Sequence, residues 1–430
     1  MTKRPMSGHA RRMDSDRARG RGGERKGVSR GDGQGNGQAK GIKADAAYAA
    51  LRRHLNSLPV GFPKTPAGMR ILQRLFTPVE ARAALGLDWR FRSAAEAAAE
   101  LAVRGIRAEE LAFEAGQPDF YALLRSMAAK GNLLMRATNQ SFALMPFVVG
   151  MYELQLARLS RELIEDTGSF MREGYGLELL TTGEAQTRVI PIGAAIRPEH
   201  AIADYDEARS LIRKAGGTIA VVECVCRRGA DLAGKPCAST ERRELCMVFR
   251  DFAATVLREG WGRALSEEEA LALCDLNEKE GLIMRPSNER EPQFLCACCG
   301  DCCGLIAVVK AMKHPADFVA TNHRAALDPL LCVGCGACVR SCPMGAYAMA
   351  EAPEAGLRAA LDQGRCIGCG VCVPACKFGA LRLEALSDKR VPPRDTEELL
   401  TRLAAAKPTL WRRLRLGASG LFGLRVRPHG

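Results

Sequence analysis

The sequence predicts a multi-domain α+β protein, and three observations lead to this prediction. The chain has 430 residues, enough for two to four domains with hydrophobic cores of their own. Its first part carries apolar residues at helical spacing, whereas its middle part alternates short strand-like runs with helices. Near its end, residues 331–349 resemble residues 365–383. We therefore expect a helical N-terminal domain, a central α/β domain and a small C-terminal domain built from two repeats.

Both ends of the chain are basic, and the part between them is not. The net charge is +13, and residues 1–43 contribute twelve Lys and Arg against four acidic residues. Because these residues are poor in apolar side chains, we expect a disordered basic tail over 1–43. We expect a second basic tail over 387–430, where Trp, Leu and Phe lie among arginines and glycines weaken any helix. This tail either stays in solution or makes peripheral contact with an anionic membrane surface.

The cysteine content indicates the compartment. Eighteen cysteines in a chain of this length are typical of metal ligands in a reducing environment, not of a secreted disulfide scaffold. The chain has no run of eighteen apolar residues and no apolar core near its start, so we expect neither a transmembrane segment nor a secretory signal. These features predict a cytoplasmic protein.

Residues 44–160 are expected to form the helical domain. Ser93 and Glu96 have the spacing of a capping box, which marks the start of a helix that ends near Val103. The other elements expected here are helices over 44–57, from Met69, over 120–130 and over 153–167, and a hairpin whose turn is 137–141. Three helices followed by a hairpin are the order of a winged-helix domain.

Such a domain either contacts DNA or serves as a packing module. A reading helix needs side chains that reach phosphates and base edges. The expected helix and wing offer Arg125, Lys130 and Arg136, which is a small basic set. DNA is therefore a weakly supported partner.

Residues 161–324 are expected to form a cysteine-rich α/β domain. The run Gly217–Glu223 is a buried type of strand that leads directly into Cys224. Other strands are expected at 188–192, 282–285 and 293–295, and helices at 205–214, 239–257 and 266–280. The domain then presents cysteines at the ends of its strands.

The strongest signal in the chain is a pair of cysteine runs with the pattern CxxCxxCxxxC. Two such runs hold two [4Fe–4S] clusters, and the fourth cysteine of each run binds the other run's cluster. Zinc sites also use CxxC units, but not in this longer run. We therefore assign one cluster to Cys332, Cys335, Cys338 and Cys376, and the second cluster to Cys366, Cys369, Cys372 and Cys342.

These runs resemble the bacterial two-cluster ferredoxin domain over residues 325–386. The resemblance implies a ferredoxin-like fold in which each half supplies a cluster-binding loop, a short helix after the fourth cysteine, and a strand. Pro343 follows the first run as in that family, but Lys377 takes this place after the second run. A lysine beside a cluster raises its potential without removing a ligand.

A second cysteine group lies at 296–303, within the segment CACCGDCC. Cys296, Cys299 and Cys302 have the CxxCxxC spacing, and Cys224 or Cys226 can supply a fourth thiolate. This set predicts a third metal site, holding either an iron–sulfur cluster or zinc. The alternative is a redox-active thiol site at Cys298 and Cys303, similar to the CCG motifs of heterodisulfide reductases. Three more cysteines precede the segment: Cys237 and Cys246, which have no assigned role, and Cys274, which is expected to be a buried apolar residue.

The whole layout resembles a family of bacterial and archaeal proteins with a dicluster ferredoxin domain. The resembling segments include LNSLPVGFP (55–63), MPFVVGMYELQLARL (145–159), ECVCR (223–227) and FLCACCGDCCG (294–304). This family is defined by its domain plan and has no settled reaction. The resemblance therefore implies domains and cofactors, and no substrate.

These observations predict an iron–sulfur electron-transfer protein, either a relay or a subunit of a redox complex, with a redox protein as its partner. One alternative is a redox-sensing DNA-binding regulator. Another is an oxidoreductase that acts on a disulfide or sulfur compound at 296–303. Whether the chain is itself an enzyme is left open. It has no GxxxxGK[ST] loop and no GxGxxG after a strand, so the nucleotide-binding classes are not indicated.

Overall fold

A computed structural model of the protein describes residues 35–136, 138–196, 202–353, 356–426 and 428–429. Residues 43–430 form one compact unit. The first helix, α1 (Gly35–Ser57), begins inside the predicted disordered tail, so that prediction is wrong for residues 35–43. Extending a formed helix costs far less than starting one, which explains how a helix can continue into a polar segment. Residues 1–34 of the predicted tail lie outside the described residues.

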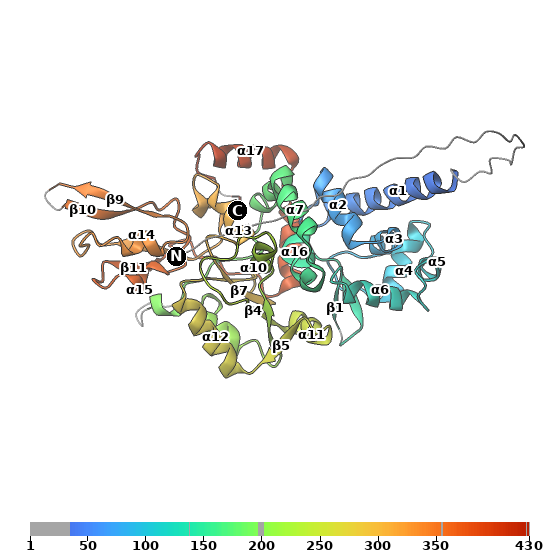
Figure 1. Cartoon of the computed structure of the whole chain (residues 1–430), viewed down its shortest axis with the longest axis horizontal. Coiled ribbons are helices and arrows are strands. Elements are labelled where there is room, and N and C mark those ends of the chain that lie inside the picture. Colours follow the sequence, from blue (N-terminus) through green and yellow to red (C-terminus); the bar gives the residue numbers. More distant parts are fainter. Residues whose placement is uncertain (1–34, 137, 197–201, 354–355, 427, 430) are drawn as a thin grey trace, which may run out of the picture. The chain divides into compact units, whose positions relative to one another are not determined.

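Short helices and a hairpin follow α1 (Figure 1). In chain order they are α2 (Pro66–Leu75), α3 (Pro78–Ala83), η1 (Ala84–Gly86), α4 (Ala94–Val103), α5 (Ala108–Glu114), α6 (Phe120–Ala129), β1 (Leu134–Arg136) and β2 (Ser141–Ala143). β1 and β2 pair antiparallel, and Arg92 forms an isolated bridge with Phe142. The expected order of three helices and a hairpin is therefore present, and the winged-helix assignment itself stays a prediction.

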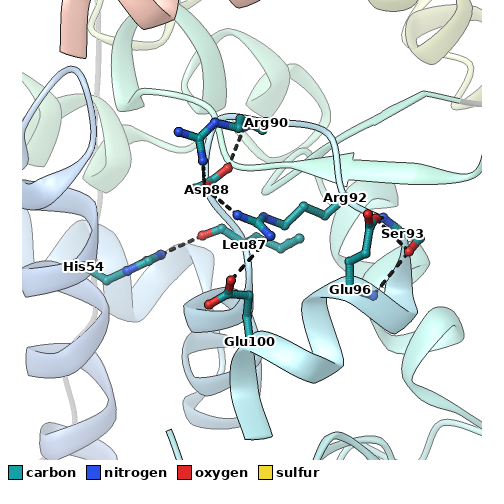
Figure 2. Close-up of polar contacts among 8 residues, drawn as sticks. All are labelled: His54, Leu87, Asp88, Arg90, Arg92, Ser93, Glu96 and Glu100. Carbon is teal, nitrogen blue, oxygen red and sulfur yellow. Dashed lines mark hydrogen bonds and ion pairs between the residues drawn. The ribbon is translucent and has the colours of Figure 1, made fainter. Parts of the chain in front are cut away.

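The segment before α4 is fixed by side chains that bind the backbone and one another. Figure 2 shows the capping box, in which the Ser93 hydroxyl accepts from the Glu96 N–H while the Glu96 carboxylate accepts from the Ser93 N–H. Asp88 accepts hydrogen bonds from the guanidinium groups of Arg90 and Arg92 at 3.2 and 3.0 Å. The predicted helix start at Ser93 is confirmed, because both orphan N–H groups find carboxylate or hydroxyl oxygens.

The helix expected over 153–167 is wrong as a single element. The structure divides it into η3 (Glu153–Arg158) and α7 (Arg161–Phe170), separated by an extended Leu159. Ser160 caps α7 by accepting from the Leu163 N–H at 3.2 Å, which starts a new helix where the sequence appeared continuous. Three further elements flank this pair: η2 (Phe147–Met151), η4 (Met171–Tyr175) and α8 (Gly176–Leu180).

The centre of the chain is a five-stranded antiparallel sheet with the order β5-β3-β4-β7-β6. Its strands are β3 (Ile219–Glu223), β4 (Glu244–Phe249), β5 (Gly262–Leu265), β6 (Ile283–Pro286) and β7 (Phe294–Cys298). One face carries Ala220 and Val248, which belong to the core of the N-terminal helices. The other face carries Val221 and Met247, which belong to the core formed with α9 (Ala208–Arg213) and α12 (Glu267–Lys279). The sheet therefore separates two hydrophobic cores.

Two sequence predictions for this region are wrong. Residues 239–257 do not form one helix, because their first half contains β4 and only Arg250–Arg258 forms α11. Leu245, Met247 and Phe249 are fully buried on one face, a period of two that belongs to a strand. The strand expected over 188–192 is replaced by isolated bridges, and Pro191 removes a donor that a strand there would need.

The C-terminal cysteine runs lie among short elements that repeat. Each run is followed by a strand, β9 (Tyr347–Ala352) or β11 (Leu381–Ala385), and these pair antiparallel with β10 (Gly356–Leu361) and β8 (His323–Leu327). The short helices α14 (Ala337–Ser341) and α15 (Cys372–Ala375) lie before the fourth cysteine of each run, not after it as expected. The third and fourth cysteines therefore lie at opposite ends of one helical turn.

The predicted basic tail over 387–430 contains two helices. It contains α16 (Thr396–Ala405), whose Leu399, Leu400 and Leu403 join the core of the N-terminal helices, and α17 (Leu410–Leu421). The remaining elements are η5 (Gly193–Ala195), η6 (Asp204–Asp206), α10 (Val225–Leu232), α13 (Gly304–Lys310) and η7 (Pro315–Phe318). None of the helices in the described residues is both long and apolar enough to cross a membrane.

Candidate metal centres

The eight cysteines of the two runs lie in two groups of four. A small enclosed space of about 20 Å³ is lined by four of them: Cys332, Cys335, Cys338 and Cys376. The other four are Cys366, Cys369, Cys372 and Cys342, which lie close enough for their charges to interact. Burial, together with the charges of the other three, raises the pKa of the Cys369 thiol well above its usual value. Each group therefore contains three cysteines of one run and the fourth of the other run.

Donors from neighbouring elements point at several of these sulfur atoms. The backbone N–H groups of Ala325, Ala346 and Ala359 donate to the Sγ atoms of Cys366, Cys342 and Cys332 at 3.3, 3.3 and 3.5 Å. The Tyr347 hydroxyl lies 3.2 Å from Cys372 Sγ. Such donors stabilise thiolates, and hydrogen bonds to the sulfurs raise the potential of a bound cluster. The residues present therefore fit two [4Fe–4S] clusters.

Six of the central cysteines form a closed ring of neighbouring thiols. All six line one cavity, and each thiol lies close enough to the next to change its pKa, in the order Cys224, Cys226, Cys303, Cys298, Cys296 and Cys246, with Cys246 next to Cys224 again. Strand β4 supplies Cys246, and strand β7 supplies Cys296 and Cys298. Cys224 and Cys226 lie at the start of α10, and Cys303 lies at the start of α13. We call this group the six-thiol ring.

The ring thiols do not share one protonation state. Hydrogen bonds from Cys226 and Cys246 lower the pKa of Cys224 well below its usual value, and hydrogen bonds from Cys226 and Cys298 do the same for Cys303. The pKa values of the donors Cys226 and Cys246 rise, because losing the proton would break the hydrogen bond that each of them donates. The ring therefore favours thiolates at two of its positions, and thiolates are the form that binds metals.

A second central group contains three cysteines and one carboxylate. Ligand atoms of Cys237, Cys299, Asp301 and Cys302 all lie within 4.8 Å of one another, and we call these residues the Cys3Asp group. The sulfur atoms of Cys237 and Cys299 are 3.8 Å apart, and those of Cys299 and Cys302 are 3.1 Å apart. Tetrahedral Zn–S bonds of ~2.3 Å give sulfur separations of about 3.8 Å, so the group is the right size for a single metal ion.

Hydrogen bonds hold the carboxylate of this group in its ionised form. Burial alone would raise the pKa of Asp301, but hydrogen bonds from Cys299, the Ala238 N–H and the Ser239 hydroxyl hold it well below the usual range. The Ala238 N–H donates at 2.7 Å and Ser239 Oγ at 3.1 Å. A hydrogen bond from Cys302 lowers the pKa of Cys299 to about 7. The group therefore carries negative charge near neutral pH.

The structure divides the cysteines that the sequence grouped as a third metal site. Cys224, Cys226 and Cys296 lie in the six-thiol ring with Cys298 and Cys303, whereas Cys299 and Cys302 lie in the Cys3Asp group. Cys274 lies in neither group and is fully buried, as expected. The CxxCxxC spacing does not keep its members together, because Cys296 lies in a strand and the residues after Cys298 turn away from it.

Sequence reasoning gave no role to three residues of these sites: Cys237, Cys246 and Asp301. Cys246 was hidden by the helix expected over 239–257, whereas the alternation of LCMVF would have placed it on one face of a strand. Arg227 is 1% exposed, and its Nη1 donates to the Ala297 carbonyl oxygen at 2.9 Å. Although burial opposes it, the nearby charges of Cys224 and Cys299 raise the pKa of Arg227.

One contact joins the central cysteines to the C-terminal ones. Gly300, between Cys299 and Asp301, packs so closely on Pro343 that a Cβ atom at residue 300 would lie 2.4 Å from the Pro343 carbonyl oxygen. A cavity of about 1020 Å³ beside this contact is lined by both Cys299 and Cys342. Lys310 Nζ donates to the Gly300 carbonyl oxygen at 3.3 Å and holds the loop in this position. Residues next to ligands of two candidate centres are therefore in van der Waals contact.

The basic side chains of the expected reading helix and wing face acidic residues. Arg125 pairs with Glu259 and Arg136 with Asp251, both at 2.9 Å, and Lys130 pairs with Glu80 at 2.5 Å. The Thr255 hydroxyl also donates to the Met135 carbonyl oxygen at 3.3 Å, so α11 packs against β1. DNA phosphates would have to displace these carboxylates and α11, and the structure gives no support to DNA binding.

Comparison with protein-family models finds a match to the 4Fe-4S dicluster domain over residues 331–380. This segment is similar to a two-cluster iron–sulfur domain. The match supports a ferredoxin-like iron–sulfur domain near the C-terminus and, with it, a role in electron transfer. No curated protein and no solved structure matches the chain.

Proposed function

We propose that the chain carries electrons between a redox partner protein and its own central cysteines, through two [4Fe–4S] clusters held by residues 325–386. The cluster ligands are the two groups of four described above, with Cys376 and Cys342 exchanged between the runs. Each cluster, when bound, takes up or releases one electron. The protein supplies the thiolates, the N–H donors that tune them and the path between the two cysteine regions.

The contact between Gly300 and Pro343 carries this proposal. Pro343 follows Cys342, which is a proposed ligand of the second cluster, and Gly300 follows Cys299 of the Cys3Asp group. A ferredoxin that served only outside partners would not need this side packed against a further cysteine site. We therefore infer that electrons cross here to a further iron–sulfur centre among the central cysteines, because zinc, the other metal that thiolates bind, takes up no electrons. Their many free thiols favour a reducing compartment such as the cytoplasm.

Anaerobic purification with iron and sulfide counting tests this function. The two-cluster assignment requires at least about eight irons per chain, and EPR spectra of the reduced protein should show two interacting clusters. Fewer than about eight irons in a fully loaded preparation would contradict it. Cys274→Ser is a matched control, because Cys274 is buried and lies in none of the cysteine groups.

We also propose that α17 docks the protein on an anionic membrane surface. Small residues face the body of the protein, where Gly417 packs against Leu177 and Gly420 against Phe318. The opposite side exposes Trp411 (82%), and the exposed Phe422 (85%) follows the helix. The other exposed members of this surface are Leu414, Arg412, Arg415, Leu421, Leu424 and Arg425. Apolar side chains among arginines, with no acidic residue in 401–430, match an anionic lipid surface.

Co-sedimentation with lipid vesicles tests this contact. We expect binding to vesicles that contain phosphatidylglycerol and none to phosphatidylcholine alone, and we expect salt to weaken it. Trp411→Ser with Phe422→Ser should abolish binding, whereas Phe113→Ser, which removes an equally exposed ring (86%) elsewhere, should not. Equal binding of both variants would show that α17 is not the docking surface.

A further inference from the structure

An apolar cavity lies directly against the six-thiol ring. Its volume is about 400 Å³, within the range of small-molecule sites, and all six ring cysteines line it. The other walls come from η3, α7 and the face of the central sheet that meets the N-terminal helices. They include the apolar side chains of Val148, Leu156, Ile164, Met171, Trp261 and Phe294. A row of thiols therefore forms one wall of a space that is otherwise mostly hydrocarbon.

Two buried arginines beside the ring have unused hydrogen-bonding groups. Arg227 is 1% exposed and Arg285 is 7% exposed, and both line the cavity. Arg285 Nε donates to Thr187 Oγ1 at 2.7 Å, but its Nη1 has no hydrogen-bond partner within the described part of the chain. The same holds for Nε and Nη2 of Arg227. Arg285 lies beside Cys298 and Cys303 of the ring, and Arg227 lies between the ring and the Cys3Asp group, because its charge acts on Cys224 and Cys299.

A buried cation is stable only beside an anion. Thiolates at Cys224 and Cys303 balance the two positive charges, but they leave the arginine N–H groups named above without hydrogen-bond acceptors. A metal centre held by several thiolates supplies such acceptors, because its sulfur atoms accept hydrogen bonds. Six thiols also exceed the four that one metal ion or one cubane cluster needs. The number of thiols and the unused arginine donors together indicate a centre with several metal atoms.

We propose that the six-thiol ring binds a polynuclear iron–sulfur centre, separate from the Cys3Asp group, and that the cavity binds a small, uncharged, mainly apolar molecule beside that centre. This inference depends on the proposed function in one respect only, which is that electrons reach the ring centre from the C-terminal clusters. The ligand is uncharged and apolar because the walls offer hydrocarbon in place of water. Of the other charged lining residues, Glu223, Lys235 and Asp301 are exposed, and the Glu153 carboxylate already accepts a hydrogen bond from the Gly150 N–H at 2.7 Å.

Cysteine variants separate this ring from the grouping that CxxCxxC spacing suggests. Cys246→Ser and Cys303→Ser should each lower the iron and sulfide content, whereas Cys302→Ser should not remove the same iron. Cys274→Ser should match the wild type. The opposite result, in which Cys302→Ser loses that iron and Cys246→Ser retains it, would overturn the ring assignment. EPR signals of the two C-terminal clusters must persist in all four variants, which separates loss of the ring centre from failure of the proposed function.

The cavity is tested with a defined probe and a matched pair of variants at Gly229. A Cβ atom at Gly229 would lie at ordinary contact distances, 3.6 Å from Ile164 and from the Tyr152 hydroxyl, so Gly229→Ala fits and Gly229→Leu fills the space. In the wild type and in Gly229→Ala, 1-hexanethiol and 1-hexanol should change the EPR spectrum of the ring centre. Gly229→Leu, with unchanged iron content, should bind both at least tenfold more weakly.

The charged analogue 6-mercaptohexanoate should have no effect at the same concentrations. If neither hexyl compound changes the spectrum, the cavity does not bind such molecules and the proposal is wrong. Equal binding of 6-mercaptohexanoate would show that the site does not select for uncharged ligands. Equal binding by Gly229→Leu would show that the probe acts outside this cavity.

Discussion

The contact between Gly300 and Pro343 provides the sharpest test of how the two cysteine regions communicate. Gly300 is not among the glycines with positive φ, so Gly300→Ala adds no backbone strain and acts through its methyl group alone. That methyl would lie 2.4 Å from the Pro343 carbonyl oxygen, whereas ordinary contacts begin at 3.4 Å. The two loops must therefore separate by roughly 1 Å, and overpacking of this kind costs about 1–3 kcal/mol.

The matched control is Gly304→Ala, four residues further along the same segment. A Cβ atom at Gly304 meets nothing within 4 Å, so this substitution adds the same methyl group without a clash. We expect Gly300→Ala to lower the unfolding temperature and to slow electron transfer from the photoreduced C-terminal clusters to the central site. Gly304→Ala should change neither property.

Laser-flash photoreduction with anaerobic absorption spectroscopy measures this transfer, and iron counting checks that both variants are fully loaded. The reasoning would be refuted if Gly300→Ala transferred electrons at the rate of Gly304→Ala while its stability fell as expected. The contact would then be structural only, and electrons would reach the central site by another route or not at all.

Three further predictions concern other parts of the molecule. Cys376→Ser should abolish the cluster of the first cysteine run and Cys342→Ser that of the second, each with loss of about four irons and one EPR component. Burial raises the pKa of Glu289 to about 7, so its protonated form stabilises the fold at low pH, and this contribution is lost as the pH rises from about 4.5 through 7. Glu289→Gln should remove a pH-dependent difference of about 3 kcal/mol, measured by urea unfolding at pH 5 and pH 8. Arg413→Met should cost about 3–5 kcal/mol in thermal unfolding because it leaves the Glu178 carboxylate buried without its partner, and Glu178→Gln in the same chain should restore part of the loss.

The local elements were predictable where a single mechanism dominates. The capping box at Ser93 starts α4 as expected, and the helix expected at 266–280 is present as α12, because the capping interactions of Ser93 and Ser266 involve residues only three positions apart. The buried strand that ends before Cys224 was also predicted correctly. Predictions failed where an element depends on distant partners. β4 was taken for a helix because its edges pair with β3 and β7, which are far away in the sequence.

The sequence by itself determined the type of chemistry at the C-terminus, because all eight cysteines of the two runs lie close together in the chain at a spacing that few cofactors require. Only the tertiary structure decided how the central cysteines are shared. Cys296 and Cys299 are three residues apart and lie in different groups, while Cys246 joins the ring from another strand. Sheet pairing brings together residues that spacing cannot relate, and it also places Arg227 where its charge requires thiolates.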